Sequence, residues 1–549
     1  MSKNKESVII VILFFVIAFL IYGLSLTNDF VHFDDNILIF DNPAVHQLTP
    51  ATIAWVFTHF DPELYIPLTF LSFQIDHLIG GLNPFIFHLT NLILHTLNAL
   101  LVYVFLNLLT KRKLLAIICG LIFLVHPLNA EAVAWASGRK DVLSAFFFLG
   151  SLIFYLKTSN ERRATSNYYA SIISFVLALL SKASVILLPL ILILIDYKND
   201  RRVDRKSILK KIPYFALSGI FGIVAIFGKQ SVLADSPLKD SILMASKSTV
   251  FYLQKFLMPF DLSVIYPYNE NISITSSEFF VPLIVLLVLI ALIAIKFRNN
   301  RKATFGSLFF FLMLAPSFSN YAKAGDVFFA SDRYVYLPII GLIYIFVLIL
   351  FSLIKSINNK IRIPIFVIPS IILIFFGVLA FKQSLVWKNT DTLFTNVTKH
   401  FDYSDMAFNK VGAQRFEQGK LAEAEEHLMK SLEIKPNARA YYNLGLVRLE
   451  QDDIEGVVEM NLKAIELDPK HVSAYLNLGY AYWKKGMQSD AEITFKKALS
   501  IKPDDVDVLT NLAGLYISME RPSEARELLE RAIKIDPEDE YVGGLMERI

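Results

Sequence analysis

The feature that most constrains this chain is a series of apolar stretches about as long as a membrane is thick. A helix needs about 17 to 25 residues to cross roughly 30 Å of hydrocarbon. The sequence has eleven candidate stretches, at residues 8–26, 84–108, 113–128, 141–157, 168–182, 183–197, 212–228, 279–297, 303–319, 334–355 and 362–381. Composition agrees, since 54% of the residues are hydrophobic and only 19% are charged. We therefore predict an all-α, multispanning membrane bundle.

The distribution of basic residues between these stretches predicts the orientation, because Lys and Arg are retained on the cytoplasmic side. Basic clusters lie in the first five residues, at 111–113, 198–211, 297–302 and 355–362, whereas residues 28–83 contain seven carboxylates and no Lys or Arg. Segment 241–258 is interpreted as an external interfacial or re-entrant helix, because counting it as a span would place the 297–302 cluster outside. We expect a cytoplasmic N-terminus, an external loop at 28–83 and an extracytoplasmic C-terminal part.

A repeat begins near Asp405. Four prolines are spaced 33, 34 and 34 residues apart: Pro436, Pro469, Pro503 and Pro537. This is the period of the tetratricopeptide repeat, in which two antiparallel helices pack per unit and successive units form an α-solenoid. We therefore expect a transmembrane module at 1–398 and an extracytoplasmic domain of about four repeats at 399–549. The net charges differ too: +11 before Lys399 and −8 from Lys399 onward.

Three of these repeats carry asparagine at the same position: Asn443, Asn477 and Asn511, each 34 residues apart. One amide per repeat on an inner helix can form hydrogen bonds with the backbone of an extended peptide, whatever its side chains. The other interpretation is that Asn is common in the repeat consensus. The first predicts that these residues bind a protein or peptide partner.

The external loop supplies the first candidates for chemistry. Asp34 and Asp35 are adjacent, and His32 precedes them. Such a pair is suited to act as a general base or, with His32, to help bind a divalent cation. An acidic turn or helix cap is the alternative interpretation. The sequence leaves metal dependence open.

Several basic residues, with acidic neighbours, are predicted to lie on the same side of the membrane as Asp34 and Asp35. Glu131, Arg139, Lys140 and Asp141 follow one apolar stretch, Lys182 lies between two others, and Asp332 and Arg333 precede another. Charges at such depths are costly unless they are paired or functional. Together these cations are suited to bind the phosphate of an anionic lipid, although each alone also fits an interface anchor or an ion pair.

Other chemistries are disfavoured. The sequence contains no glycine-rich phosphate loop, no HExxH and no GxSxG motif, and no basic patch interleaved with aromatic residues for nucleic acid. Its single cysteine, Cys119, excludes an intramolecular disulfide and lies in an apolar stretch. An ATP-driven transporter, a cytosolic kinase and a nucleic-acid partner are therefore not expected.

The chain resembles the transmembrane and tetratricopeptide-repeat O-mannosyltransferases and their prokaryotic relatives, within the C-type glycosyltransferase superfamily. The resemblance rests on the order of five segments before the repeats: TNDFVHFDDNILIFDNP, HPLNAEAVAWASGRKD, SKAS, YLQKFLMPFDLSVIYP and SDRYVYLP. It implies an inverting transfer of a sugar from a polyprenyl-phosphate donor to an acceptor hydroxyl outside the membrane.

The resemblance also implies roles for residues. Asp34 and Asp35 match the family's catalytic acidic pair, and we expect Asp35 to be the base with Asp34 as the supporting carboxylate. Arg139, Lys182 and Arg333 are expected to hold the donor phosphate. The chain departs from the family at Ala183, where the family commonly has Glu after the lysine, so donor contacts there are expected to differ.

The sequence thus predicts a glycosyltransferase of the plasma (inner) membrane that acts on protein Ser or Thr, with the repeats gathering the acceptor. No cofactor is required by this interpretation, and a divalent metal stays open. Two alternatives remain: transfer to a glycan or lipid, and a non-catalytic membrane scaffold that recruits proteins through its repeats.

Overall fold

The computed structural model describes residues 3–61, 63–158, 163–200, 204–229, 237–268, 272–296, 300–318, 321, 328–361, 367–537 and 539–549. Within these residues the regular secondary structure is helical except for one antiparallel pair of strands, β1 (Tyr266–Pro267) and β2 (Phe328–Ala330). It divides into two compact units, Met1–Asn396 and Val397–Ile549. The all-α fold class predicted from the sequence is confirmed.

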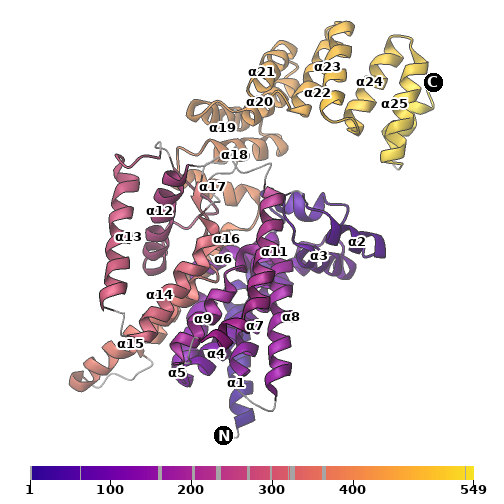
Figure 1. The fold of residues 1–549 in the computed structure, drawn as a ribbon. Coiled ribbons are helices and arrows are strands. Elements are labelled where there is room, and N and C mark those ends of the chain that lie inside the picture. Colours follow the sequence, from indigo (N-terminus) through magenta and orange to yellow (C-terminus); the bar gives the residue numbers. More distant parts are fainter. Residues whose placement is uncertain are drawn as a thin grey trace. The chain divides into compact units, whose positions relative to one another are not determined.

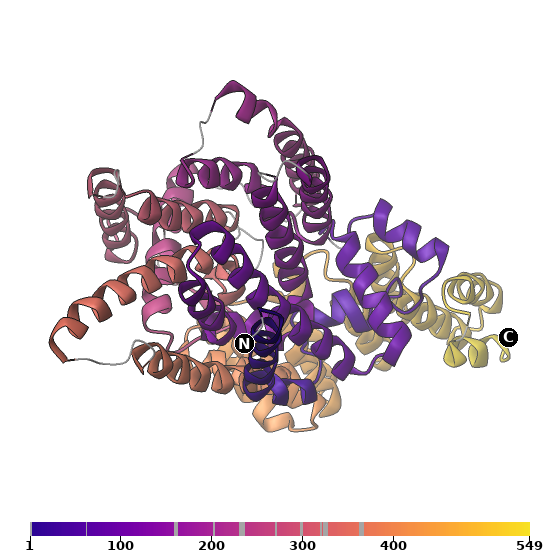
Figure 2. The same cartoon turned by 90° about the horizontal axis from the view of Figure 1, so that it is seen from below.

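The first unit is a bundle of helices (Figure 1). A helix coincides with each of the eleven apolar stretches: α1 (Lys3–Tyr22), α4 (Pro84–Thr110), α5 (Lys113–Val125), α7 (Arg139–Lys157), α8 (Ala164–Ser181), α9 (Leu188–Lys198), α11 (Ile212–Lys229), α13 (Ser277–Lys296), α14 (Arg301–Leu314), α15 (Ile339–Ile361) and α16 (Val367–Val386). Residue 297, residue 319 and the start of the last stretch, 362–366, lie outside the described residues. Viewed from below, α1 lies among the other helices of the unit (Figure 2).

Length and apolar composition suit a subset of these helices for crossing a membrane. In the described part of the chain they are α1, α4, α8, α13, α15 and α16. A seventh crossing is possible if α5 and the segment Pro127–Ala134 are one span, bent by 56°. The remaining helices of the eleven are shorter or, like α7, begin with charged residues. These apolar helices make the chain an integral membrane protein.

Local sequence explains how the central helix α4 begins and how two other helices pack. The Asn83 side chain accepts a hydrogen bond from the Phe85 N–H at 3.1 Å, and Pro84 occupies the first turn, where its missing N–H costs nothing.

Gly306 of α14 and Gly341 of α15 face one another where the helices cross, and a Cβ on either would collide with the other helix. Small residues therefore allow these two apolar helices to approach closely.

The predicted external loop is folded rather than extended. It follows the short helical turn η1 (Gly23–Thr27) and contains the short turn η2 (Asn36–Phe40) and the helices α2 (Pro50–Thr58) and α3 (Pro67–Gly80). Leu38, Val45, Phe70 and Phe73 lie in its buried apolar core. At its start, the Asp29 N–H donates to the Lys388 carbonyl at 2.8 Å and the His32 N–H donates to Thr390 Oγ1 at 3.0 Å. The loop is thereby joined to the segment that follows α16.

The remaining elements of the first unit shape the region around this loop. They are η3 (Pro127–Asn129), α6 (Ala130–Ala134), η4 (Ala136–Gly138), η6 (Ala183–Val185), α10 (Arg205–Leu209), α12 (Leu238–Leu257), η7 (Ala315–Ser317), η9 (Asp332–Val335) and α17 (Thr390–His400), which runs into the second unit. The Tyr252 hydroxyl donates to the Ser331 carbonyl at 2.7 Å, and the Tyr266 hydroxyl donates to Asp332 Oδ1 at 2.8 Å. These bonds hold α12 and β1 against η9.

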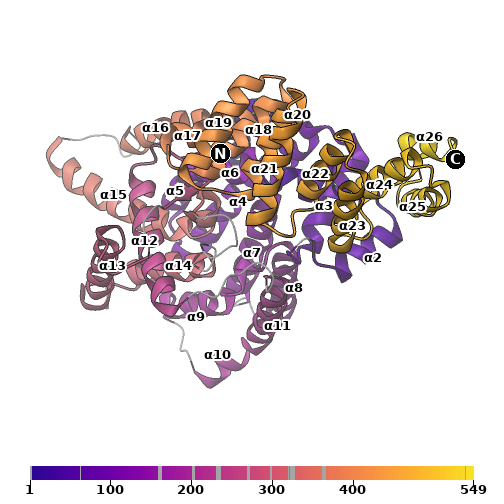
Figure 3. The same cartoon turned by 90° about the horizontal axis from the view of Figure 1, so that it is seen from above.

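The second unit consists of helix pairs, which follow one another in Figure 3. They are α18 (Asp405–Glu417) with α19 (Leu421–Ile434), α20 (Ala438–Glu450) with α21 (Ile454–Leu467), α22 (Val472–Lys484) with α23 (Gln488–Ile501), and α24 (Val506–Ser518) with α25 (Pro522–Ile535), followed by α26 (Glu540–Met546). The turn inside each pair contains one residue with positive φ: Gly419, Asp452, Gly486 and Glu520, with φ between 56° and 74°. The same left-handed turn therefore recurs with the repeat period, in two cases without glycine.

Candidate active site

Asp35 is buried, and both of its carboxylate oxygens accept backbone hydrogen bonds. Its Oδ2 accepts from the Val31 N–H and its Oδ1 from the Ser137 N–H, both at 2.9 Å. Burial raises the pKa of Asp35 to about 6, although the hydrogen bonds act in the opposite direction. Asp35 thus joins the external loop to η4. It has no exposed surface with which to meet an acceptor.

Asp34 has the opposite environment. About a third of its side chain, 34%, is exposed, and its Oδ2 lies 3.0 Å from Lys140 Nζ at the start of α7. Of the two carboxylates, Asp34 is therefore the accessible one and Asp35 links the loop to η4, while the catalytic role of either stays a prediction. Adjacent residues in this turn point in different directions, which the sequence does not reveal.

One aromatic side chain brings two cations together. Lys140 Nζ lies 4.7 Å from the ring centroid of Trp135, and the guanidinium carbon of Arg333 lies 5.0 Å from the same residue's ring. The Arg333 guanidinium also lies 5.6 Å from the ring of Phe33, the residue before Asp34. These contacts bring the start of α7, η9 and the external loop into one cluster.

Arg333 is held by Glu131 of α6. Its Nη1 lies 2.5 Å from Glu131 Oε1, and its backbone N–H donates to Glu131 Oε2 at 3.1 Å. Burial acts against the charged form, but the nearby Tyr334, Glu131 and Asp34 outweigh it and raise the pKa of Arg333 above its ordinary value. Arg333 is therefore a permanent cation at this site.

Lys182 follows the last residue of α8 and pairs with α7. Its Nζ lies 2.5 Å from Asp141 Oδ1, and 21% of its side chain is exposed. The positive charges of Lys140 and Arg333 also act on its ammonium group. Among the three cations of the cluster, Lys182 is the most exposed, since the side chains of Lys140 and Arg333 are 7% and 8% exposed.

Arg139 does not belong to this cluster, contrary to the sequence-based expectation that it holds the donor phosphate. It is fully buried and each of its three guanidinium nitrogens already has a hydrogen-bond partner. Nε donates to Asn91 Oδ1 at 2.5 Å, Nη1 to Ser72 Oγ at 3.1 Å, and Nη2 to Asp76 Oδ2 at 2.6 Å and to the Phe87 carbonyl at 2.9 Å. Arg139 therefore fastens α7 to α3 and α4.

Lys140, rather than Arg139, is the residue at the start of α7 that contacts Asp34 and Trp135. Successive residues on a helix differ in direction by about 100°, so neighbours at the start of α7 meet different surroundings. Lys140 contacts Asp34 and Trp135, whereas Arg139 points to α3. From the sequence alone, one can conclude only that Arg139 and Lys140 point in different directions. Their partners cannot be identified, because these lie far away in the chain.

A metal site at His32, Asp34 and Asp35 gains no support from the geometry. Over the described ranges of the chain, no three His, Cys, Asp or Glu residues come together in a way that could hold an ion. The His32 ring lies 5.1 Å from that of Phe40, while Asp35 is turned inward to Val31 and Ser137.

The three repeat asparagines lie on successive first helices, α20, α22 and α24, and all are half-buried. Asn443 Nδ2 donates to Oδ1 of Asn409, the equivalent residue of the preceding repeat, at 2.9 Å. Asn511 Nδ2 donates to the Asp507 carbonyl at 2.8 Å. Asn477 Nδ2 is buried and has no hydrogen-bond acceptor among the described residues.

Comparison with known proteins confirms the repeats. Models of the tetratricopeptide repeat match residues 438–471 and 489–549, and a model described as TPR repeat matches 462–486. Among solved structures, TTC0263, a thermophilic tetratricopeptide-repeat protein of Thermus thermophilus, is 20% identical, with 32% of this chain and 93% of that one covered and a TM-score of 0.26.

Curated relatives extend the comparison to the membrane unit. Human protein O-mannosyl-transferase TMTC1 is 27% identical over 505 residues, which cover 78% of this chain and 55% of that protein. Human TMTC4 is 34% identical over 189 residues, 29% of this chain and 25% of that protein, and human TMTC2 is 43% identical over 98 residues, 18% and 12%. The chain thus spans about half the length of the first of these relatives. The chain, which carries apolar helices and tetratricopeptide repeats of its own, is thus similar to curated proteins named protein O-mannosyl-transferase.

Proposed function

We propose that the protein is an inverting glycosyltransferase that moves a monosaccharide from a polyprenyl-phosphate donor to a Ser or Thr hydroxyl of a protein. One observation carries the proposal: the accessible carboxylate of Asp34 lies in one cluster with Lys140, Lys182 and Arg333. A base beside several cations suits a reaction in which a hydroxyl loses a proton while a phosphate leaves.

In this mechanism the acceptor oxygen attacks the anomeric carbon of the sugar and its proton passes to Asp34. The bond between that carbon and the phosphate oxygen breaks, and the electron pair leaves with the phosphate. Lys182 and Arg333 stabilise the charge that develops there, because fixed cations stabilise a leaving anion without reorganising. A single displacement inverts the anomeric configuration. Lys140 orients Asp34, and Asp35 holds the loop.

The names of the relatives, protein O-mannosyl-transferases, make mannose the first sugar to try and a protein the first acceptor. The acidic repeats are poorly suited to an anionic lipid phosphate, so we assign donor binding to the membrane unit and acceptor binding to the repeats. The asymmetry of Lys and Arg supports a cytoplasmic N-terminus and extracytoplasmic repeats in the plasma (inner) membrane.

The test compares Asp34→Asn with Asp41→Asn, a change at an exposed carboxylate of the same loop. With a polyprenyl-phosphate mannose donor and a peptide acceptor, Asp34→Asn should lower kcat by about 10² to 10⁴ while the donor still binds, because only the base is lost. Asp41→Asn should react at the wild-type rate.

Two results would contradict the assignment. Wild-type turnover in Asp34→Asn would remove Asp34 as the base. Loss of turnover in a folded Asp35→Asn variant, with Asp34→Asn active, would return that role to Asp35. A glycan or lipid that is glycosylated in place of the peptide identifies the alternative acceptors, and a protein that recruits partners but transfers no sugar is a scaffold.

A further inference from the structure

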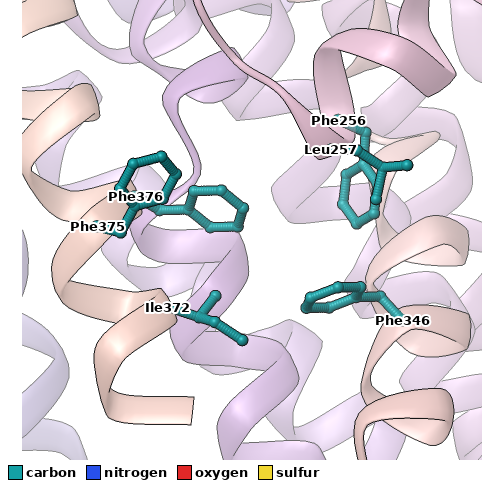
Figure 4. A pocket seen from close by; sticks show the side chains of 6 residues that line it. All are labelled: Phe256, Leu257, Phe346, Ile372, Phe375 and Phe376. Carbon is teal, nitrogen blue, oxygen red and sulfur yellow. The ribbon is translucent and has the colours of Figure 1, made fainter. Parts of the chain in front are cut away.

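An apolar cavity of about 180 Å³ lies between α12, α15 and α16. Six side chains line it, and all are apolar: Phe256, Leu257, Phe346, Ile372, Phe375 and Phe376. In Figure 4, Ile372 and Phe376 of α16 lie across the cavity from Phe346 of α15 and Leu257 of α12. Because no lining side chain offers a hydrogen bond, the cavity suits a hydrocarbon rather than a sugar or a peptide backbone.

Two of the side chains that line this cavity are themselves exposed at the surface of the unit. Leu257 is 62% exposed and Phe375 is 45% exposed, and α15 and α16 are both apolar enough to cross a membrane. Large apolar side chains exposed on such helices contact lipid chains. A chain lying in the bilayer therefore has access to the cavity.

A short, rigid path joins the cavity wall to the cation cluster. His126 Nε2 bonds to the Phe256 carbonyl at 3.1 Å, and the His126 ring stacks on that of Phe256 and contacts that of Phe376, with centroids 5.2 and 4.6 Å apart. Five residues later along η3 and α6, Glu131 holds Arg333. At a rise of about 2.0 Å per residue in the 3-10 turn η3 and about 1.5 Å in α6, this separation is roughly 9 Å along the chain.

We propose that the cavity binds an isoprenoid unit near the phosphate end of the donor's polyprenyl chain; this inference rests on the proposed function. A lipid whose phosphate meets Arg333 and Lys182 extends its first units into this region. An apolar cavity of about 150 Å³ holds a molecule the size of benzene, so the space suits one five-carbon branched unit.

The lining selects this occupant by shape. Four of the six side chains are phenylalanine, which presents flat, rigid faces and loses little rotamer freedom on contact. A methyl-branched, planar isoprenoid unit fills such a slot, whereas a straight acyl chain fills less of it and must lose more freedom to do so. The cavity therefore contributes to selection of the donor over bulk phospholipids.

The experiment uses the full chain in phosphatidylcholine vesicles and a polyprenyl monophosphate that carries a photoreactive diazirine in its second isoprenoid unit. Labelled peptides are identified by mass spectrometry. Labelling should fall on α12, α15 and α16 around the six lining residues. Ile372→Trp fills the cavity and should lower labelling and probe affinity by about 10- to 200-fold, the effect of losing two to four buried methylene groups.

The matched control is Ile374→Trp, because Ile374 lies on the same helix, is 68% exposed and does not line the cavity. Its labelling should equal that of the wild type. Leu257→Trp approaches the cavity from its exposed rim and provides a second blocking variant if Ile372→Trp fails to fold. Thermal unfolding of each variant identifies a folding defect.

Three results would overturn the proposal: labelling elsewhere in the chain, unchanged labelling in both blocking variants, or equal competition by excess phosphatidic acid and by unlabelled polyprenyl phosphate. The last would make an acyl chain the occupant. Failure of the proposed function gives a different pattern, in which the blocking variants lower labelling as expected but the wild type transfers no sugar from any polyprenyl-phosphate donor.

Discussion

Lys182 Nζ lies 2.5 Å from Asp141 Oδ1, although 41 residues separate the two in the sequence. The pair joins the end of α8 to the start of α7. The residue before Asp141 is Lys140, which contacts Asp34. An ammonium group that is ordered by a carboxylate but remains partly exposed is available for a second anion.

The first prediction concerns this lysine. Lys182→Met removes a charge-assisted contact to the donor phosphate, a bond worth about 1.5 to 3 kcal/mol, so KM for the donor should rise by about 10- to 150-fold. Lys182→Arg keeps the charge and should restore part of the affinity. Steady-state kinetics with varied donor measure both. An unchanged KM in Lys182→Met would assign Lys182 a structural role with Asp141.

The second prediction concerns stability and pH. Because burial raises the pKa of Asp35 to about 6, the folded protein binds this proton more tightly than the unfolded chain, where the pKa is near 3.9. The contribution of Asp35 to the free energy of unfolding is therefore greatest below about pH 4, falls as the pH rises to 6, and is constant above. The total change is about 3 kcal/mol.

Asp35→Asn removes this titration. The difference in unfolding free energy between wild type and variant should change between pH 4 and 6 in the direction just given, as measured by denaturant unfolding in detergent. Asp41→Asn, at an exposed position, provides the control. A difference that does not vary with pH would show that the Asp35 carboxylate titrates alike in both states.

The third prediction concerns Arg139. Arg139→Met leaves Asp76 buried without its cation, which typically costs about 3 to 5 kcal/mol, so unfolding should occur at lower temperature. The double change Arg139→Met with Asp76→Leu removes both charges and should recover much of this loss. Its KM for the donor should equal that of the wild type. A stable single variant with raised donor KM would restore Arg139 as a phosphate ligand.

The fourth prediction concerns the repeats. The proposal that one amide per repeat binds the acceptor backbone predicts that changing Asn443, Asn477 and Asn511 together to Ala should weaken protein-acceptor binding, because each change removes hydrogen bonds to the peptide. Loss of one hydrogen bond should raise the dissociation constant of the acceptor by about 3- to 10-fold. A short acceptor that does not reach the repeats should react as before. Equal losses for long and short acceptors would indicate a folding defect instead.

The fifth prediction concerns orientation. A reporter fused after Ile549 should behave as extracytoplasmic, and one inserted at 198–211 should be cytoplasmic, because Lys and Arg concentrate in the latter segment. Protease accessibility in sealed vesicles gives an independent measurement. A cytoplasmic C-terminal reporter would separate the repeats from the proposed site.

Periodic features of the fold could be predicted from the sequence. The proline spacing predicted the helix pairs because each repeat packs mainly on its neighbours, and apolar runs predicted helices because lipid leaves the backbone no other partners. The positive-φ turns at Asp452 and Glu520 could not be predicted from residue type, since repetition of the turn overrides the preference for glycine seen at Gly419 and Gly486.

The site was harder to predict because it depends on contacts between distant segments. Adjacent carboxylates in one turn have different environments: Asp35 meets Ser137, 102 residues away, and Asp34 meets Lys140, 106 residues away. Likewise the partner of Arg139 is Asp76, 63 residues away. Residue type indicated candidate groups for the chemistry, but only the fold decides which of two neighbours points to solvent.

The bonds from Asp29 and His32 to Lys388 and Thr390 have a consequence for how such proteins diversify. The residues that hold the start of the external loop, Lys388 and Thr390, precede the first repeat. The contacts that position the candidate site therefore lie before the repeats in the sequence. Tails of different length can then be exchanged without rebuilding the site, and a chain shortened just after Asn396 should keep its reactivity toward small acceptors. Shortening before Lys388 should abolish it. Under the proposed function, exchange of the repeats at the junction between the two units should change acceptor choice and leave the sugar transfer itself unchanged.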